Sequence, residues 1–286
     1  MTRSTTLPVI DFHVHIGLKE HWHEWVHRFQ KEADSEFYTR YQDMTDPETF
    51  ARYVVGQGIS RAVILPEISP ITTGIVSNEY VLNFTRGREV YIPFGTVNPS
   101  LATHPHLELK RLIREGVRGV KLYPSYNRFF PDDSRLYPLY EVARDEGIPV
   151  LIHTGSSVFE GALVKYANPL HLDEVARRFP GLILVMAHSG RGLWYREAAF
   201  LARLHEHLYC EISGLPPKKL LEYFPDLERN ADKFLFGSDW PGIQSIASNI
   251  QDIKSLPIRT ESIEKILYRN AARILGLPEA VGGSTG

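Results

Sequence analysis

The chain alternates short apolar runs with longer segments of mixed polarity, a pattern that predicts strands separated by helices. Eight runs are rich in β-branched and aromatic residues and are bounded by turn-forming residues. After the first interval they start roughly 25 to 33 residues apart, about the length of a strand, a helix and their loops. The predicted strands cover residues 8–15, 61–68, 91–98, 119–124, 148–155, 182–190, 208–214 and 233–241.

The segments between these strands carry apolar residues at helical spacing, as in "DPETFARYVVGQG" and "HPHLELKRLIREG". Several of them end in glycine, where helices commonly stop. Apolar strands alternating with helices indicate a parallel sheet that is covered on both faces. Eight such units predict a closed (β/α)₈ TIM barrel, a single domain over residues 1–286. The alternative is an open doubly wound sheet, but "HVHIGLKEHW" after the first strand is not a glycine-rich phosphate loop.

Three segments add to this minimal barrel. Residues 17–46 form a long insert after the first strand, and the helical spacing of Trp22, Val26 and Phe29 predicts a helix over the barrel mouth or at a subunit contact. Residues 257–277 predict a final helix packed on the outside of the barrel. We expect residues 281–286 to form a flexible tail.

Composition and charge narrow the class of protein. The formal charge of −2 and the pI near 6.6 give no basic footprint for nucleic acid. The sequence contains no apolar run long enough for a membrane span and no long apolar N-terminal stretch. Cys210 is the single cysteine, so an intramolecular disulfide is impossible. We therefore expect a cytoplasmic protein that does not bind nucleic acid or membranes, and the aromatic insert suggests a homodimer.

Polar side chains stand where the predicted strands end. Asp11, His13 and His15 recur at every second position of "VIDFHVHIG", so a regular strand would point them the same way. In TIM barrels the chemistry lies at the carboxyl ends of the strands. Closing the barrel brings strand eight, with Asp239, beside the two histidines of strand one. The residues at the strand ends are His13, His15, Lys121, His153, His188, Glu211 and Asp239.

Four imidazoles and a carboxylate are suitable ligands for a divalent transition metal such as Zn²⁺. Each residue alone has an ordinary explanation, as a hydrogen-bonded core histidine or a turn aspartate. Burying an unpaired polar group, however, costs about 1–3 kcal/mol. Several such groups at the same end of successive strands therefore favour a metal site.

The motifs "DFHVH", "GVKLYP", "PVLIHTG", "LVMAHSG" and "FGSDWP", in this order, resemble those of the amidohydrolase superfamily. More narrowly, the chain is similar to the amidohydrolase-related branch that holds the aminocarboxymuconate-semialdehyde and γ-resorcylate decarboxylases. The resemblance spans the chain from strand one to strand eight. It implies a distorted (β/α)₈ barrel with one or two divalent metal ions, most often Zn²⁺.

The resemblance also implies roles for individual residues. His13, His15, His153 and Asp239 match metal ligands, while His188 matches a histidine near the metal-bound water or a ligand of a second metal. Lys121 lies where two-metal members carry a bridging carbamylated lysine, although "GVKLYP" resembles the one-metal branch. One Zn²⁺ per chain is thus the first expectation, and two ions remain the alternative. The same ligands also accept Mn²⁺, Co²⁺ or Fe²⁺.

This site predicts an enzyme with a small-molecule substrate. Asp239 or His188 would move a proton between water and a leaving group, which gives a metal-dependent hydrolase of a small anionic acyl or cyclic substrate. Loss of CO₂ from an aromatic or muconate-like acid on the same ligands gives a decarboxylase instead. A non-catalytic metal-binding barrel is the third reading. Candidate substrate-binding residues are Arg191, which could hold a carboxylate bidentately, and Lys121, Tyr123 and Trp240 at the mouth.

Overall fold

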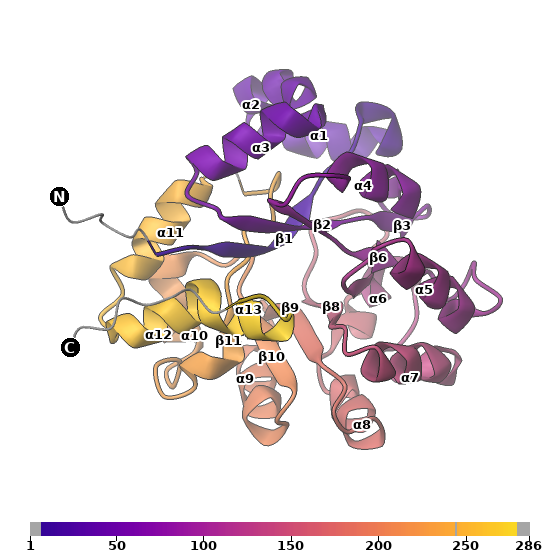
Figure 1. Cartoon of the computed structure of the whole chain (residues 1–286), viewed down its shortest axis with the longest axis vertical. Coiled ribbons are helices and arrows are strands. Elements are labelled where there is room, and N and C mark those ends of the chain that lie inside the picture. Colours follow the sequence, from indigo (N-terminus) through magenta and orange to yellow (C-terminus); the bar gives the residue numbers. More distant parts are fainter. Residues whose placement is uncertain (1–6, 244, 279–286) are drawn as a thin grey trace.

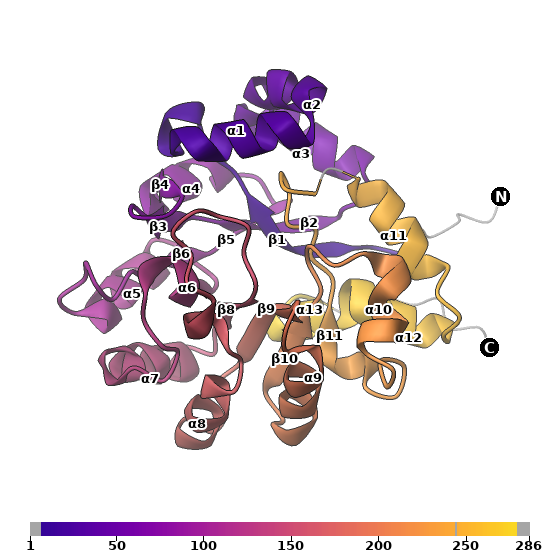
Figure 2. The same cartoon turned by 180° about the vertical axis from the view of Figure 1, so that it is seen from behind.

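The structure, a computed structural model, describes residues 7–243 and 245–278. The tail expected at 281–286 lies outside the described residues. The strands gather at the centre with helices around them (Figures 1 and 2), and the predicted TIM barrel is confirmed. Its strands are β1 (Ile10–His15), β2 (Arg61–Leu65), β5 (Tyr91–Pro93), β6 (Gly95–Thr96), β7 (Val120–Leu122), β8 (Val150–Gly155), β9 (Leu184–Arg191), β10 (Leu208–Glu211) and β11 (Phe234–Leu235).

The strands pair in parallel as two arcs, β1-β2-β5 and β6-β7-β8-β9-β10-β11. The third predicted strand is split at Phe94, whose amide donates to the Ile64 carbonyl at 3.0 Å, while the amide of Gly95 turns to Gly119 at 2.9 Å. A side chain at Gly119 would overlap the Phe94 ring, so glycine allows this close approach.

The barrel closes between β1 and the segment after β11. The amide of Phe12 donates to the Phe236 carbonyl at 3.0 Å, and the amide of His15 donates to the Trp240 carbonyl at 2.8 Å. The amide of Asp239 returns a bond to the His13 carbonyl at 2.9 Å. These three bonds place the first and last strands side by side, as the barrel prediction requires.

Helices alternate with the strands around the barrel. Asp46 caps α3 by accepting a hydrogen bond from Thr49, and Pro47 occupies its first turn. None of the helices within the described ranges is long and apolar enough to cross a membrane. The outer helices are α3 (Pro47–Gly56), α4 (Asn78–Thr85), α5 (Pro105–Arg114), α6 (Pro124–Asn127), α7 (Tyr137–Asp145), α8 (His171–Arg178), α9 (Tyr195–Leu204), α10 (Leu220–Tyr223) and α11 (Ile246–Lys254).

The insert at 17–46 contains two helices where the spacing predicted one, α1 (Glu24–Ala33) and α2 (Ser35–Arg40). Asp34 ends α1 and caps α2, because its carboxylate accepts from the amide of Phe37 at 2.8 Å. A hairpin of β3 (Glu67–Ser69) and β4 (Gly74–Val76) lies against the insert. The amide of His23 donates to the Thr73 carbonyl at 2.9 Å, which ties the hairpin to the start of α1.

The predicted C-terminal helix is present as α12 (Thr260–Glu264), a π-helical turn at Lys265–Arg269 and α13 (Asn270–Ile274). Ala271 and Ala272 of α13 are buried in one cluster with Ile10 and Leu151 from the barrel strands. In Figure 1 this helix crosses the end of the barrel that faces the viewer. Helix α13 therefore covers the end of the barrel where the strands begin, and the cavity lies at the opposite end, where the strands end.

Candidate metal centre

A cavity of about 370 Å³ lies at the carboxyl ends of the strands. The strand ends contribute its polar groups, while the insert and the loop after β8 contribute apolar and aromatic side chains. Helix α1 thus forms part of the wall over the barrel mouth. The lining includes His13, His15, Trp22, Val26, Phe29, Gln30, Glu67, Lys121, Tyr123, Tyr126, His153, Ser156, Val158, Phe159, His188, Arg191 and Asp239.

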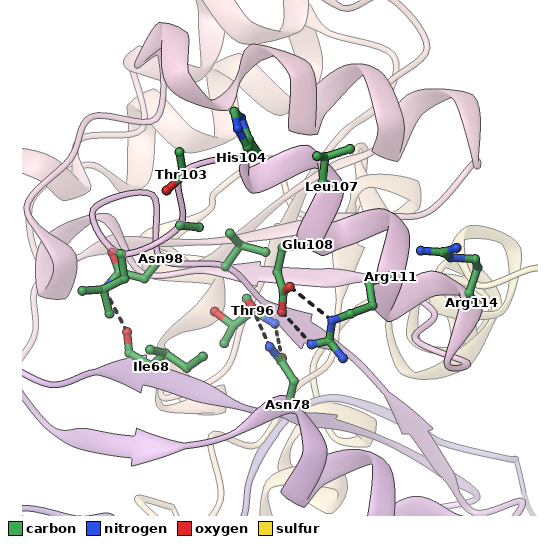
Figure 3. A pocket seen from close by; sticks show the side chains of 13 residues that line it. Ile68, Asn78, Thr96, Asn98, Thr103, His104, Leu107, Glu108, Arg111 and Arg114 are labelled. Atoms are coloured by element: carbon green, nitrogen blue, oxygen red, sulfur yellow. Dashed lines mark hydrogen bonds and ion pairs between the residues drawn. The ribbon is translucent and has the colours of Figure 1, made fainter.

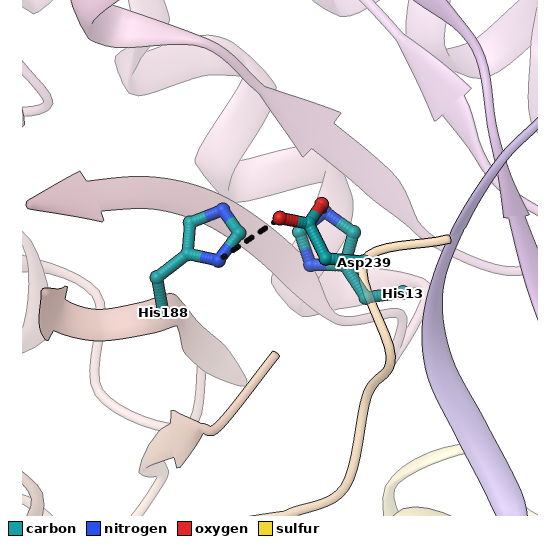
Figure 4. A group of neighbouring side chains, drawn as sticks. All are labelled: His13, His188 and Asp239. Carbon is teal, nitrogen blue, oxygen red and sulfur yellow. Dashed lines mark ion pairs between the residues drawn. The ribbon is translucent and has the colours of Figure 1, made fainter. Parts of the chain in front are cut away.

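His13, His188 and Asp239 offer ligand atoms that all lie within 4.8 Å of one another (Figure 4). Nε2 of His13 is 3.5 Å from Oδ1 of Asp239, and Nδ1 of His188 is 3.9 Å from Oδ2. His15 adjoins this group, with Nε2 3.1 Å from Nε2 of His13 and 3.7 Å from Asp239 Oδ1. Strands one, six and eight therefore converge on one point.

Hydrogen bonds fix the orientation of the His13 ring. Its Nδ1 lies 3.0 Å from Oε2 of Glu211, while Nζ of Lys121 lies 3.5 Å from its Nε2. The Glu211 carboxylate also accepts from the hydroxyl of Ser213 at 2.8 Å and from its amide at 2.6 Å. The tautomer with its proton on Nδ1 is the one that can donate to the Glu211 carboxylate, and in it the Nε2 lone pair faces the cavity. Glu211 is among the residues that the sequence places at the strand ends, but no sequence signal marks Ser213.

His188 and Asp239 adopt left-handed backbone conformations, with φ of 62° and 67°. Residues other than glycine rarely adopt this conformation, so surrounding hydrogen bonds must hold these two residues in it. The His188 amide donates to Glu211 at 3.3 Å, and its ring Nδ1 donates to the Ser213 carbonyl at 3.0 Å. These bonds hold His188 at the cavity, and the bond from the Asp239 amide to the His13 carbonyl holds Asp239 there.

His153 completes the set of four imidazoles. It is 2% exposed, and its ring centre lies 4.9 Å from that of His188. Among the described residues, its buried Nε2 has no hydrogen-bond partner, and the same holds for Nδ1 of His15. A buried nitrogen without a partner is costly, and a cation coordinated at Nε2 of His153 would satisfy it. The donor set of imidazoles and one carboxylate therefore fits a divalent metal.

Burial keeps the imidazoles neutral, the form that binds metal. It lowers the pKa of His15 to about 3 and the pKa values of His13, His153 and His188 well below the ordinary value. Burial also lowers the pKa of Lys121 to about 8, although nearby carboxylates oppose this shift. The pKa of Asp239 is raised by burial, against the pull of Arg191 and Lys121.

Of the residues predicted to bind substrate, Arg191 and Tyr123 line the cavity, whereas Trp240 does not. Arg191 donates from Nε and Nη2 to the Ser156 carbonyl, at 3.3 and 2.9 Å, and its Nη1 is 3.6 Å from Asp239 Oδ2. Tyr123 lines the cavity and donates from its hydroxyl to the Pro66 carbonyl at 2.6 Å. Trp240, expected at the mouth, is instead buried behind the site, where its ring lies 4.5 Å from that of Phe50.

Asp11 also differs from its expected place. A regular strand would place its carboxylate on the face of the two histidines, either to orient an imidazole or as a structural carboxylate. The register of β1 shifts between Asp11 and Val14. Oδ1 of Asp11 accepts instead from the amides of His13 at 3.1 Å and Ser238 at 2.8 Å. Asp11 therefore helps to join the first strand to the segment that carries Asp239.

A second cavity, of about 650 Å³, lies between α5 and the loop that follows β6 (Figure 3). Of its charged groups, Arg111 is already paired with Glu79 at 3.0 Å, Glu108 at 2.7 Å and Glu115 at 2.7 Å. Asn78, a polar group of the same wall, bonds both ways with the backbone of Thr96. These groups satisfy one another, so the cavity at the strand ends is the better candidate for chemistry.

The chain belongs to the amidohydrolase family, whose model matches residues 10–277. This membership makes it a metal-dependent enzyme of the amidohydrolase superfamily. The comparison with curated proteins finds no significant match.

Solved structures share the fold over nearly the whole chain. An uncharacterised TIM-barrel protein of Bordetella bronchiseptica is 26% identical, with a TM-score of 0.79 over 94% of this chain and 99% of that chain. A dihydroxybenzoic acid decarboxylase of Polaromonas sp. JS666, with bound manganese and the inhibitor 2-nitroresorcinol, is 16% identical, with a TM-score of 0.70 over 96% and 98%. A probable 2-pyrone-4,6-dicarboxylic acid hydrolase of Acinetobacter baumannii is 15% identical, with a TM-score of 0.65 over 94% and 99%.

Proposed function

We propose that the protein is a metal-dependent hydrolase of a small anionic acyl or cyclic substrate. One observation carries this proposal: Asp239 reaches the histidine cluster with Oδ1 and faces Arg191 with Oδ2. The Asp239 side chain is 22% exposed, whereas that of His13 is fully buried. The carboxylate thus stands between the metal ligands and the space where substrate and water would lie.

His13, His15, His153 and Asp239 would hold one Zn²⁺, with Mn²⁺, Co²⁺ or Fe²⁺ compatible with the same ligands. In such a site a bound divalent cation would lower the pKa of water to about 7 and so supply hydroxide at neutral pH. The placement of Lys121, 3.5 Å from His13 Nε2, is also compatible with a carbamylated lysine in a site of two ions. We favour one ion per chain, because the motif "GVKLYP" around Lys121 resembles that of the one-metal branch.

Asp239 and His188 are the groups that would move protons. Burial raises the pKa of Asp239, so its carboxylate is a better base than an exposed aspartate. His188 is neutral and keeps the Nε2 lone pair, since Nδ1 bears the proton donated to Ser213. Either group can take a proton from water and return it to the leaving group.

Arg191 and Lys121 give the cavity a cationic side that would hold a substrate carboxylate. The two bonds from Arg191 to the Ser156 carbonyl hold its guanidinium in place, which leaves donors on Nη1 and Nη2 for a ligand. Tyr123, Tyr126 and Phe159 line the same space. Aromatic walls beside two cations fit a small, flat, negatively charged molecule.

Decarboxylation is the second candidate. The Polaromonas neighbour is a decarboxylase of dihydroxybenzoic acid, and the aromatic wall of Tyr123 and Tyr126 would also accept such a ring. In this reaction Asp239 would protonate the ring carbon that loses CO₂. The proton donor and the cationic side would be the same as in hydrolysis.

The test is a substrate panel with two readouts. Protein loaded with Zn²⁺ or Mn²⁺ is incubated with cyclic esters and amides that bear carboxylates, and with aromatic and muconate-type acids. Hydrolysis releases acid without CO₂, and we expect it for a member of the first group. CO₂ release from the second group would replace the hydrolase with the decarboxylase, while turnover of neither group would contradict both proposed substrate classes.

A further inference from the structure

The imidazoles of the cluster differ in how their outward nitrogen is held. Nδ1 of His13 meets Glu211, and Nδ1 of His188 meets the carbonyl of Ser213. His153 has a hydrogen bond to the backbone of Gly155. Metal-binding histidines commonly have such a partner, which fixes the tautomer and the direction of the ring.

His15 is the exception. Its Nε2 points to the cluster, 3.1 Å from His13 Nε2 and 3.7 Å from Asp239 Oδ1. With Nε2 turned inward as a ligand, Nδ1 must carry the proton and needs an acceptor. Within the described chain that buried nitrogen has no hydrogen-bond partner. The nearby acidic oxygen is Oε2 of Glu67, 3.8 Å away.

Glu67 is held where it could serve as this acceptor. It is 3% exposed and belongs to β3, the first strand of the hairpin that follows β2. The Thr73 hydroxyl, from the turn of the same hairpin, donates to Oε1 of Glu67. Oε1 is thereby engaged, and Oε2 is the oxygen that faces His15.

We propose that Glu67 is a positioning residue for His15, the counterpart of Glu211 for His13. When His15 coordinates the ion, a small turn of its ring closes the 3.8 Å separation to a hydrogen bond from Nδ1 to Oε2. The carboxylate then fixes the tautomer and makes the imidazole a stronger ligand. This inference rests on the metal site of the proposed function and adds to it a role for the β3–β4 hairpin.

The hairpin also provides a matched pair of variants. Thr72 and Thr73 are neighbours, each 1% exposed, and each donates one hydrogen bond from its hydroxyl. The Thr72 hydroxyl bonds the backbone of Tyr126 at 2.9 Å, and of the two threonines it is Thr73 that bonds Glu67. T72V and T73V therefore remove equivalent bonds from the same turn, but only T73V disturbs Glu67.

The experiment measures Zn²⁺ affinity by chelator competition in the wild type, E67Q, T73V and T72V, with melting of the metal-free forms as a fold check. The Co²⁺ absorption spectrum reports ligand geometry. We expect E67Q to weaken Zn²⁺ binding by about 10–100-fold and to alter the Co²⁺ spectrum. T73V should weaken binding less, and T72V should bind like the wild type.

The outcomes separate the role of Glu67 from the existence of the metal site. Wild-type affinity in E67Q, or equal losses in T73V and T72V, would overturn the role of Glu67. If E67Q does not fold, the comparison of T73V with T72V decides alone. A drop from two ions to one in E67Q would make Glu67 a ligand rather than a positioning residue. A wild type that binds no Zn²⁺, Mn²⁺ or Co²⁺ would instead refute the proposed metal site itself.

Discussion

Replacing Glu211 with glutamine tests how the site orients its first ligand. Oε2 of Glu211 faces His13 Nδ1 at 3.0 Å and also accepts from the hydroxyl of Ser213 and the amide of His188. Glutamine keeps the shape but removes the charge, and its amide nitrogen must face at least one donor. The His13 ring then loses its carboxylate acceptor, although all four imidazoles remain.

The size of the effect follows from this contact. A hydrogen bond to a charged group contributes about 1.5–3 kcal/mol, which corresponds to roughly 10–150-fold in an affinity. Removal of such partners of metal-binding histidines typically weakens metal binding by about 10–100-fold. We therefore expect E211Q to bind Zn²⁺ one to two orders of magnitude less tightly than the wild type.

The assay is chelator competition at fixed pH, with melting of the metal-free protein as a check of the fold. E222Q is the matched control, because Glu222 is exposed and pairs with Lys219 at 2.7 Å on the surface. The control should bind Zn²⁺ like the wild type. If E211Q folds and binds Zn²⁺ with wild-type affinity, then Glu211 does not orient a ligand, and the tautomer reasoning for His13 is wrong.

Four further changes test other parts of the site. In G237A the new Cβ would overlap the Glu211 carboxylate, so we expect the free energy of unfolding to fall by about 1–3 kcal/mol. An unchanged melting temperature would contradict the close contact of Gly237 with Glu211. Burial raises the pKa of Asp11 to about 7, so ionising this carboxyl lowers the stability of the fold as pH rises from about 4 to 7. The melting temperature of metal-free D11N should therefore increase relative to that of the wild type over this pH range. A difference in melting temperature that does not change with pH would contradict the raised pKa. R191Q should raise KM for an anionic substrate by about 10–100-fold with a small change in kcat, and an equal effect on a neutral analogue would exclude a carboxylate contact. D239N should lower kcat by about 10²–10⁴-fold, and turnover near the wild-type rate would remove Asp239 from proton transfer.

The barrel and the placement of most residues of the candidate metal centre were predictable because their signals are local. Each strand is an apolar run, and His153 and His188 stand at strand ends whose position the run itself defines. Asp239 needed one further step, the closure of the barrel, which places it beside His13 although the two are 226 positions apart in the sequence. Eight strands of similar spacing make that closure predictable.

What the sequence did not indicate depends on contacts between distant segments. Trp240 follows Asp239 directly, but its side chain packs on Phe50 and Tyr41 from α3 and the insert, so its burial could not be inferred from its neighbours. Glu67 falls within the predicted strand 61–68, where nothing marks it as functional. Glu67 faces His15 because a separate hairpin forms after β2. That hairpin is bonded to the insert through the amide of His23 and the carbonyl of Thr73.

In the proposed site, side chains from strands one, five and eight share one divalent cation at the barrel mouth. Anomalous diffraction from crystals grown with Zn²⁺, recorded on both sides of the zinc absorption edge, tests it directly. We expect one strong peak per chain within bonding distance of His13, His15, His153 and Asp239. No peak there, or a peak bound only by residues outside the cavity, would contradict the claim and the chemistry derived from it.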